Sequence, residues 1–113
     1  MSLVDEQAAF LLDFCRLVHY CTVTLKWRVT SGELMRPVEM QKIYVQNGRS
    51  KTMNSNHLKR LAGDLNFFID GKYICTYEDI KPAGDFWEAL SSKNRWGGNF
   101  NNFKDVPHFE RNA

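Results

Sequence analysis

The dipeptide Asp70-Gly71 limits the possible folds of this chain more than any other feature of its sequence. It directly joins two segments with strand character, residues 61–69 and 72–76, and the first of these contains Leu65, Phe67 and Phe68. Asp-Gly is strongly preferred in the type I′ turns that connect antiparallel strands through two residues. The sequence therefore predicts a β-hairpin, and with it an antiparallel sheet.

Three segments are predicted to be helical. Residues 3–19 have an amphipathic pattern in which the apolar residues can share one broad face. These residues are Leu3, Ala8, Leu11, Leu12, Cys15 and Val18. A short second helix is expected from Pro37, which suits a first helical turn, to about residue 46, where Asn47-Gly48 ends it. The third helix is expected over residues 82–93.

Two further strands complete the predicted architecture. Residues 23–29 alternate between apolar and polar side chains, as a half-buried strand does, and residues 108–110 form a last strand after an irregular loop at 99–104. This order of elements predicts an α+β fold, with helices packed on a small antiparallel sheet. The length of 113 residues fits one domain, and we assign residues 1–113 to it.

The composition argues against several classes of function. The 15 basic and 13 acidic residues leave a net charge of +2, which is too small to predict nucleic-acid binding. No apolar segment approaches the roughly 20 residues that span a bilayer, so membrane insertion is not expected. The N-terminus lacks the basic region of a signal peptide, which predicts synthesis in the cytoplasm. We expect the three cysteines to be reduced and the protein to be a monomer.

Two short blocks carry residues that can bind a metal. The first contains Ser55 and His57, with Asp64 seven residues after the histidine, and the second contains Asp105 and His108. Two histidines and one carboxylate are the ligands of a catalytic zinc ion that keeps one position open for water. The carboxylate of Asp105, three residues before the last histidine, is suitably placed for a general base.

These blocks resemble a known family, the zinc peptidoglycan peptidases that include D-Ala-D-Ala carboxypeptidases and phage L-Ala-D-Glu endopeptidases. The segment Ser55-x-His57-x6-Asp64, with Ala62 before the aspartate, is similar to the first zinc block of that family, and Asp105-x-x-His108 is similar to the second. Trp96-Gly97 and Pro107-His108-Phe109 are most similar to the phage endolysin branch. The glycine that the family has inside the first block is absent, and Arg60 and Leu61 occupy that region.

The resemblance implies a role for each of these residues. His57, Asp64 and His108 would bind one zinc ion, and Asp105 would take a proton from the attacking water and pass it to the leaving amine. Arg36, although its sequence context differs from that of the family, would stabilise an oxyanion or a substrate carboxylate. The resemblance also implies the Hedgehog/DD-peptidase-like fold.

Two other residues are candidates for contact with the substrate. Ser55 is expected to hydrogen-bond either the substrate or the groups around His57. Trp96, beside Gly97-Gly98, is a candidate for lining a substrate groove, although a core position is equally open. The polar run from Lys51 to Arg60 is expected to be solvated, and its positive charges would help to attract an anionic wall polymer.

The function that these residues predict is hydrolysis of peptidoglycan stem peptides. Aspartate rather than glutamate at position 105 favours an L-Ala-D-Glu endopeptidase, acting as a phage or prophage endolysin that reaches the wall after release from the cytoplasm. One alternative is a D-Ala-D-Ala carboxypeptidase. Another, from a different class, is a non-catalytic zinc-containing module that binds cell wall or protein.

Simpler interpretations exist for each of the site residues. His57 and Asp64, seven residues apart, would lie on one solvated face if they were in a helix, and Asp105 would suit a turn before Pro107. Arg36 would then be a solvated arginine at a helix start. The spacing Cys15-x3-His19-x-Cys21 also suggests a metal, but no fourth ligand is evident, and buried structural residues are the preferred interpretation there.

Overall fold

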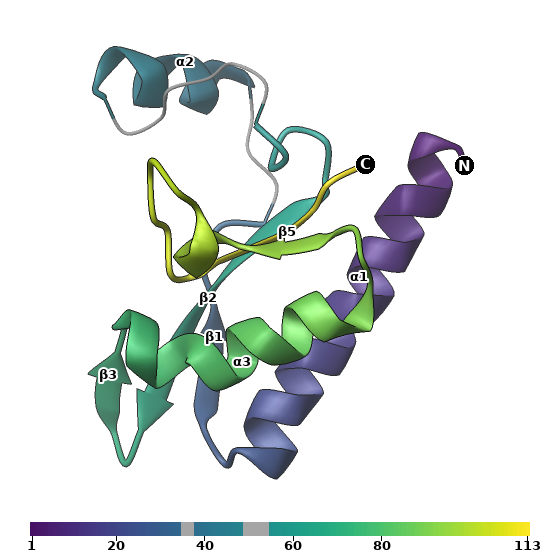
Figure 1. Ribbon diagram of the computed structural model, residues 1–113. Helices are drawn as coiled ribbons and strands as arrows, with labels where there is room; N and C mark the ends of the chain where they lie inside the picture. The colour runs from purple at the N-terminus through teal and green to yellow at the C-terminus, as the bar shows by residue number, and fades with distance from the viewer. Residues whose placement is uncertain (35–37, 49–54) are drawn as a thin grey trace.

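The computed structural model describes residues 1–34, 38–48 and 55–113, and Figure 1 shows how they are arranged. Within these residues, three α-helices accompany a five-stranded antiparallel sheet, which confirms the predicted α+β class. The helices are α1 (Leu3–His19), α2 (Val38–Gln46) and α3 (Tyr77–Leu90). The strands are β1 (Arg28–Ser31), β2 (Ala62–Ile69), β3 (Lys72–Ile74), β4 (Asn94–Trp96) and β5 (His108–Arg111).

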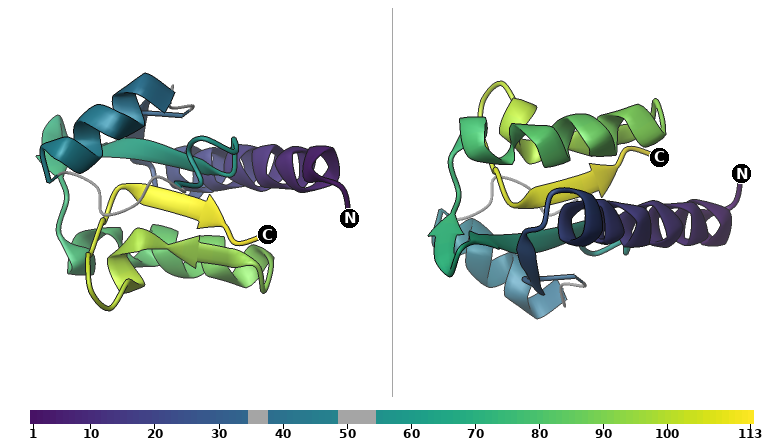
Figure 2. Two further views of the ribbon diagram at one scale, coloured as in Figure 1. Left: turned by 90° about the horizontal axis from the view of Figure 1, so that it is seen from above. Right: turned by 90° about the horizontal axis from the view of Figure 1, so that it is seen from below.

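The longest strand, β2, organises the sheet because three other strands pair with it. The strand order is β1-β2-β5-β4, and β3 also pairs with β2. The first residues of β2 pair with β5, and its second half pairs with β1 and β3. The helices α1 and α3 lie against this sheet, whereas α2 stands apart from them, beyond β2, in both views of Figure 2.

The predicted hairpin is confirmed. Asp70 and Gly71 connect β2 to β3, and both have positive φ angles, 51° and 79°. This backbone is the one that a type I′ turn requires, and glycine adopts it without the steric cost that a side chain imposes. The return strand ends at Ile74, two residues earlier than the sequence indicates.

The first helix has the predicted bounds, but the predicted apolar face is wrong. Ser2 caps it in a reciprocal pair with Asp5, which satisfies backbone groups at the helix start. The buried residues of α1 are Glu6, Phe10, Asp13, Phe14 and Leu17, whereas Leu3, Ala8, Leu11, Leu12 and Cys15 are exposed. The face that carries the phenylalanines is the buried one, because burying a phenylalanine side chain removes a large apolar area from water.

Among the described residues, no helix is both long enough and apolar enough to cross a membrane.

The strand predicted over residues 23–29 begins later than expected. The chain continues from α1 into one π-helical turn, Tyr20–Thr24, and β1 starts only at Arg28. Trp27, between them, is buried and packs edge-on against Phe67 of β2. Most of the alternating residues therefore precede the strand and do not belong to it.

The third helix starts and ends earlier than predicted. Thr76 caps it by accepting a hydrogen bond from the amide of Asp79, so Pro82 lies inside the helix instead of at its beginning. The helix ends at Leu90, and the following residues form β4, a strand that the sequence did not indicate. This strand pairs with β5 and forms one edge of the sheet.

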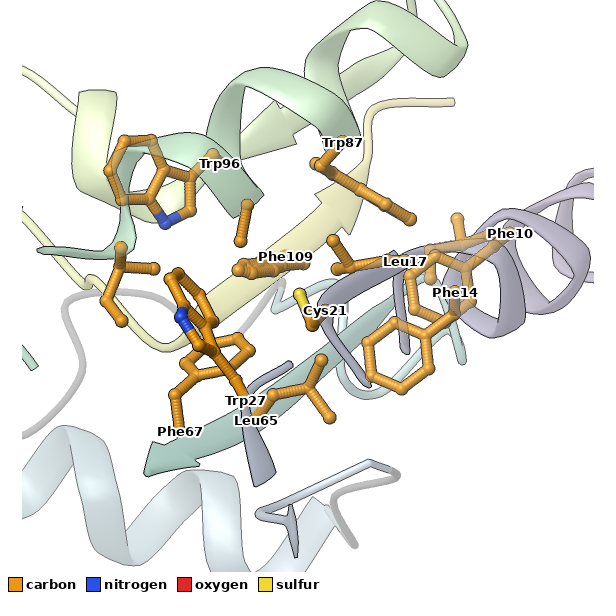
Figure 3. Packing of buried hydrophobic residues seen from close by; sticks show 13 residues of the cluster. Phe10, Phe14, Leu17, Cys21, Trp27, Leu65, Phe67, Trp87, Trp96 and Phe109 are labelled. Atoms are coloured by element: carbon orange, nitrogen blue, oxygen red, sulfur yellow. The ribbon is translucent and has the colours of Figure 1, made fainter. Parts of the chain in front are cut away.

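The core lies between the sheet and helices α1 and α3, as Figure 3 shows. Trp87 of α3 contacts Phe10, Phe14 and Phe109, so it joins both helices to β5. Its indole nitrogen donates to the backbone carbonyls of Arg95 and Glu110, which satisfies the only polar atom of this fully buried side chain. The strand that carries His108 is therefore anchored on its inner face by aromatic packing.

Candidate metal centre

Three of the predicted site residues converge on one point of the structure. His57, Asp64 and His108 each offer one ligand atom, and these atoms lie within 4.8 Å of one another. The residues come from the turn before β2, from β2 itself and from the start of β5. Both histidines are buried, and Asp64 is partly exposed. Asp64 is therefore the most solvent-exposed of the three candidate ligands.

The sheet places two of these residues. Asp64 and His108 are directly opposite each other in the antiparallel pairing of β2 with β5. A close approach of the chain at Gly97 supports the start of β5, because a Cβ atom at this position would be 2.0 Å from the carbonyl oxygen of Asp105. The amide of Asp105 donates to the Gly97 carbonyl at 2.9 Å, and the amide of His108 donates to the Asp105 carbonyl at 3.1 Å.

A tight turn places the third residue. The amide of His57 donates to Ser55 Oγ at 3.2 Å, and further backbone hydrogen bonds close the turn over residues 55–61. Arg60 has a positive φ of 58°, a backbone conformation that disfavours residues with a Cβ atom. The resemblance noted above led us to expect a glycine in this region, and the backbone at Arg60 has a conformation that suits glycine.

Hydrogen bonds fix which nitrogen of each histidine faces the centre. His57 Nδ1 lies 3.0 Å from the carbonyl oxygen of Leu34, and His108 Nε2 lies 2.7 Å from Glu110 Oε1. Both of these oxygens only accept hydrogen bonds, so both nitrogens are assigned as protonated donors. The other nitrogens, His57 Nε2 and His108 Nδ1, face Asp64 Oδ1, each at 3.3 Å, and are therefore the atoms that could bind a metal.

This set of atoms fits a zinc ion. His57 Nε2 is buried and has no hydrogen-bond partner among the described residues, which leaves a polar atom unsatisfied unless a cation is bound. A tetrahedral centre with bonds of about 2.0–2.1 Å separates its ligand atoms by about 3.3 Å. The two nitrogen-to-oxygen distances have this value, and all three ligand atoms lie within 4.8 Å of one another. Nitrogen and carboxylate donors are also the types that catalytic zinc prefers.

Without a metal, the interactions between the site residues shift the pKa values of Asp64 and His108 in opposite directions. Burial alone would raise the pKa of Asp64, but its interactions with the neighbouring rings of His108 and His57 outweigh burial and lower the pKa to about 2. Burial alone would lower the pKa of His108, but hydrogen bonds with Asp64 and Glu110 raise it to about 9. His108 therefore carries a proton on Nδ1 at neutral pH without metal, and a bound cation takes the place of that proton.

Asp105 lies at the edge of the same centre. Its Oδ2 atom is 3.9 Å from His108 Nδ1, the nitrogen that faces Asp64. Its side chain is 39% exposed, so it is accessible to a water molecule and to a substrate. A carboxylate beside the ligand atoms, but more exposed than they are, is suitably placed for proton transfer.

The other predicted site residues have different outcomes. Ser55 supports the backbone of His57 through its hydroxyl group, as described above. The sequence left both a groove and a core position open for Trp96, and the structure places it in the core: it is fully buried, and its indole nitrogen donates to the Val106 carbonyl at 2.7 Å. Arg36 lies outside the described residues. No metal-ligating group containing Cys15, His19 or Cys21 is present in the described part of the chain.

Two residues that support the centre, Glu110 and Arg95, were not predicted from the sequence. Glu110 binds the second nitrogen of His108, and Arg95 binds Glu110 from the neighbouring strand. The signal for Glu110 was its position two residues after His108, because alternate residues of a strand share one face. Arg95 had no local signal, since it is brought opposite Glu110 only by the pairing of β4 with β5.

Comparisons with known proteins agree with this geometry. A family model described as D-alanyl-D-alanine carboxypeptidase matches residues 48–111, which include both metal-binding blocks. Among solved structures, the L-Ala D-Glu endopeptidase ChiX of Serratia marcescens has a similar fold, with a TM-score of 0.68 and 23% sequence identity. The similarity covers 86% of this chain and 78% of that one. No curated protein sequence matches the chain.

Proposed function

The chain belongs to the D-alanyl-D-alanine carboxypeptidase family of peptidases, and on that premise we propose that it uses zinc to hydrolyse peptidoglycan stem peptides. The observation that carries the proposal is the convergence of His57 Nε2, Asp64 Oδ1 and His108 Nδ1. Three protein ligands leave a fourth tetrahedral position for water or substrate, which distinguishes catalytic zinc sites from structural ones. The proposed site contains one zinc ion.

The proposed mechanism assigns a step to Asp105. Zinc bound by the three ligands supplies a Lewis acid that polarises a peptide carbonyl and lowers the pKa of water to about 7. The carboxylate of Asp105, 3.9 Å from His108 Nδ1, accepts a proton from the attacking water. Asp105, now a carboxylic acid, then donates that proton to the leaving amine of the broken peptide bond. As a zinc ligand, Asp64 would be held as a carboxylate.

Within the family, we propose an L-Ala-D-Glu endopeptidase that acts as an endolysin after release from the cytoplasm. Two observations support this choice: aspartate at position 105 in the Asp-x-x-His block, and the fold shared with an endopeptidase of that specificity. A D-Ala-D-Ala carboxypeptidase is the second candidate, and the description of the matching family model favours it. The two activities differ in the bond that is broken.

The first experiment is a digest of purified peptidoglycan with the zinc-loaded protein, analysed by mass spectrometry. Release of the stem peptide below L-Ala supports the endopeptidase, whereas loss of only the terminal alanine supports the carboxypeptidase. Wall binding without any peptide product would contradict the enzymatic proposal and favour a binding module. The zinc content of the protein, measured in the same preparation, shows whether the cofactor is present.

A variant pair tests the role of Asp105. Asp105→Asn keeps the size of the side chain but cannot accept the proton, so we expect kcat to fall by about 10²–10⁴-fold. Asp85→Asn is the matched control, because Asp85 is exposed on α3, where it pairs with Lys81. Equal rates for Asp105→Asn and the unmodified protein would contradict the assignment of the base.

A further inference from the structure

We propose that Glu110, held by Arg95, is a positioning residue that fixes the ring of His108 so that Nδ1 faces the metal. This inference rests on the proposed zinc site. It adds that tight zinc binding requires Glu110 as well as the three ligands. Among the described residues, the side chain of Glu110 hydrogen-bonds His108 Nε2 and Arg95, and neither of these atoms or groups faces the centre. Its effect on the reaction would pass entirely through the orientation of His108.

The contact between the two side chains is short and buried. His108 Nε2 donates to Glu110 Oε1 at 2.7 Å, and His108 and Glu110 are 7% and 5% exposed. Both residues lie on β5 and are separated by one residue, so the pleat of the strand directs them to the same face. Phe109, between them, points to the opposite face and packs in the core. The strand therefore holds the carboxylate beside the far nitrogen of the ring.

The carboxylate itself is held in place by Arg95. Arg95 and Glu110 are opposite each other in the pairing of β4 with β5, and Arg95 Nε donates to Glu110 Oε2 at 2.8 Å. A second nitrogen of the guanidinium group contacts the same oxygen. Each oxygen of Glu110 thus has its own partner, Oε1 with the histidine and Oε2 with the arginine. Because the two partners bind different oxygens, the plane of the carboxylate is fixed between His108 and Arg95.

An aromatic ring completes the enclosure of His108. Phe100 packs against the imidazole with ring centroids 5.7 Å apart, and the guanidinium carbon of Arg95 lies 5.8 Å from the centroid of the same phenyl ring. These contacts limit the space of the imidazole but do not distinguish its nitrogens from its carbons. The hydrogen bond to Glu110 does distinguish them, because a half-turn of the ring would place carbon atoms where Nε2 and Nδ1 now lie.

The two histidines are oriented by different kinds of group. His57 is oriented by a backbone carbonyl, that of Leu34, which side-chain substitution does not remove. His108 is oriented by a side chain, so its orientation can be tested by mutation. Removing a group that orients a metal-binding histidine commonly weakens metal binding by about 10–100-fold.

The test compares three variants with the unmodified protein. Zinc affinity is measured by competition with a chromophoric chelator for Glu110→Ala, Glu110→Gln and Glu6→Gln. Glu6 is the matched control: it is as buried as Glu110, at 5% exposed, and accepts from Arg111 Nε at 2.7 Å. Within the described residues, the hydrogen bonds and ion pairs of its side chain involve only Lys93 and Arg111, so this carboxylate does not touch the centre.

We expect Glu110→Ala to bind zinc about 10–100-fold more weakly. Glu110→Gln should lose less, because its amide oxygen still accepts from Nε2, and Glu6→Gln should bind as the unmodified protein does. A second readout is the visible absorption of the cobalt-loaded proteins, which reports ligand geometry and should change in Glu110→Ala but not in Glu6→Gln. Should Glu110→Ala fail to fold, the comparison of Glu110→Gln with Glu6→Gln decides.

Two results would overturn the inference. One is equal zinc affinity for the unmodified protein and the Glu110 variants. The other is an equal loss in Glu6→Gln, which would indicate general destabilisation of β5. If the unmodified protein binds zinc and releases peptide while the Glu110 variants keep full affinity, only this inference fails. If the unmodified protein binds no zinc, the proposed function fails as well.

Discussion

Asp64 and His108, 44 residues apart in the sequence, face each other as cross-strand partners in the pairing of β2 with β5. Their distance of 3.3 Å between Oδ1 and Nδ1 is therefore set by the register of the sheet. A shift of that register by one residue would move His108 to the other face of the strand and dismantle the centre. The pairing of these strands thus brings two of the three ligands together.

Gly97 allows the close chain packing that precedes β5, so Gly97→Ala should damage both stability and the site. The added Cβ atom would be 2.0 Å from the Asp105 carbonyl oxygen and 2.9 Å from His108 Cβ. We expect the free energy of unfolding, measured in urea, to fall by about 1–3 kcal/mol. Zinc affinity should fall too, because Asp105 and His108 must move. Asn101→Ala, in the exposed loop that follows, is the control and should change neither quantity.

Replacing Arg60 by glycine should stabilise the protein. Its φ of 58° costs a residue with a Cβ atom about 1–2 kcal/mol, and glycine avoids that cost but loses more chain entropy on folding. We therefore expect Arg60→Gly to raise the free energy of unfolding by about 0.5–1 kcal/mol. Lys59→Gly, one residue earlier and without a positive φ, should lower it. Equal effects of the two substitutions would contradict this explanation.

Local signals in the sequence were sufficient for some elements. Asp70-Gly71 predicted the hairpin correctly because the turn type is determined by those two residues alone. The bounds of α1 were also predicted correctly. The pattern of the two metal-binding blocks predicted His57, Asp64 and His108, and the structure brings their ligand atoms within 4.8 Å.

Other features depend on distant contacts that no local pattern contains. The wrong face was predicted for α1 because Glu6 and Asp13 looked like solvent-facing residues. In the structure they are buried, and their partners are Lys93 and Arg111 for Glu6 and Asn94 for Asp13. Strand β4 was missed for the same reason, because its pairing with β5 gives it a place in the sheet. Arg95 could not be predicted as a site residue either, because it reaches Glu110 only through that strand pairing.

The stability of the metal-free protein should decrease as the pH rises above neutrality. The pKa of His108 is raised from 6.5 to about 9, so the stability that its proton contributes is complete below 6.5 and is lost as the pH rises towards 9. The pKa of Glu110 is lowered from 4.5 to about 2, so its contribution is complete above 4.5 and is lost as the pH falls towards 2. Stability should therefore be greatest between these two ranges.

Urea unfolding in the presence of a chelator, as a function of pH, measures this dependence. We expect His108→Gln to lack the decrease in stability between pH 6.5 and about 9, because it removes the group that titrates there. A decrease of the same size in that variant would show that another group is responsible.

Zinc should stabilise the folded protein, because the ligands converge only in the folded state. With free zinc at 100 times its Kd, the gain is about 2.7 kcal/mol, and it should appear as a rise in Tm that a chelator reverses. His57→Ala removes a ligand and should lose most of this rise, whereas His19→Ala, an exposed histidine on α1, should keep it. A rise in Tm of equal size in both variants would contradict the assignment of His57.

The central claim is that one zinc ion binds between His57, Asp64 and His108. The most direct test is a crystal structure of the zinc-loaded protein, with anomalous diffraction recorded at the zinc absorption edge. We predict one strong anomalous peak at about 2.0–2.2 Å from His57 Nε2, Asp64 Oδ1 and His108 Nδ1. A peak elsewhere, or none at saturating zinc, would contradict the claim and, with it, the proposed peptidase mechanism.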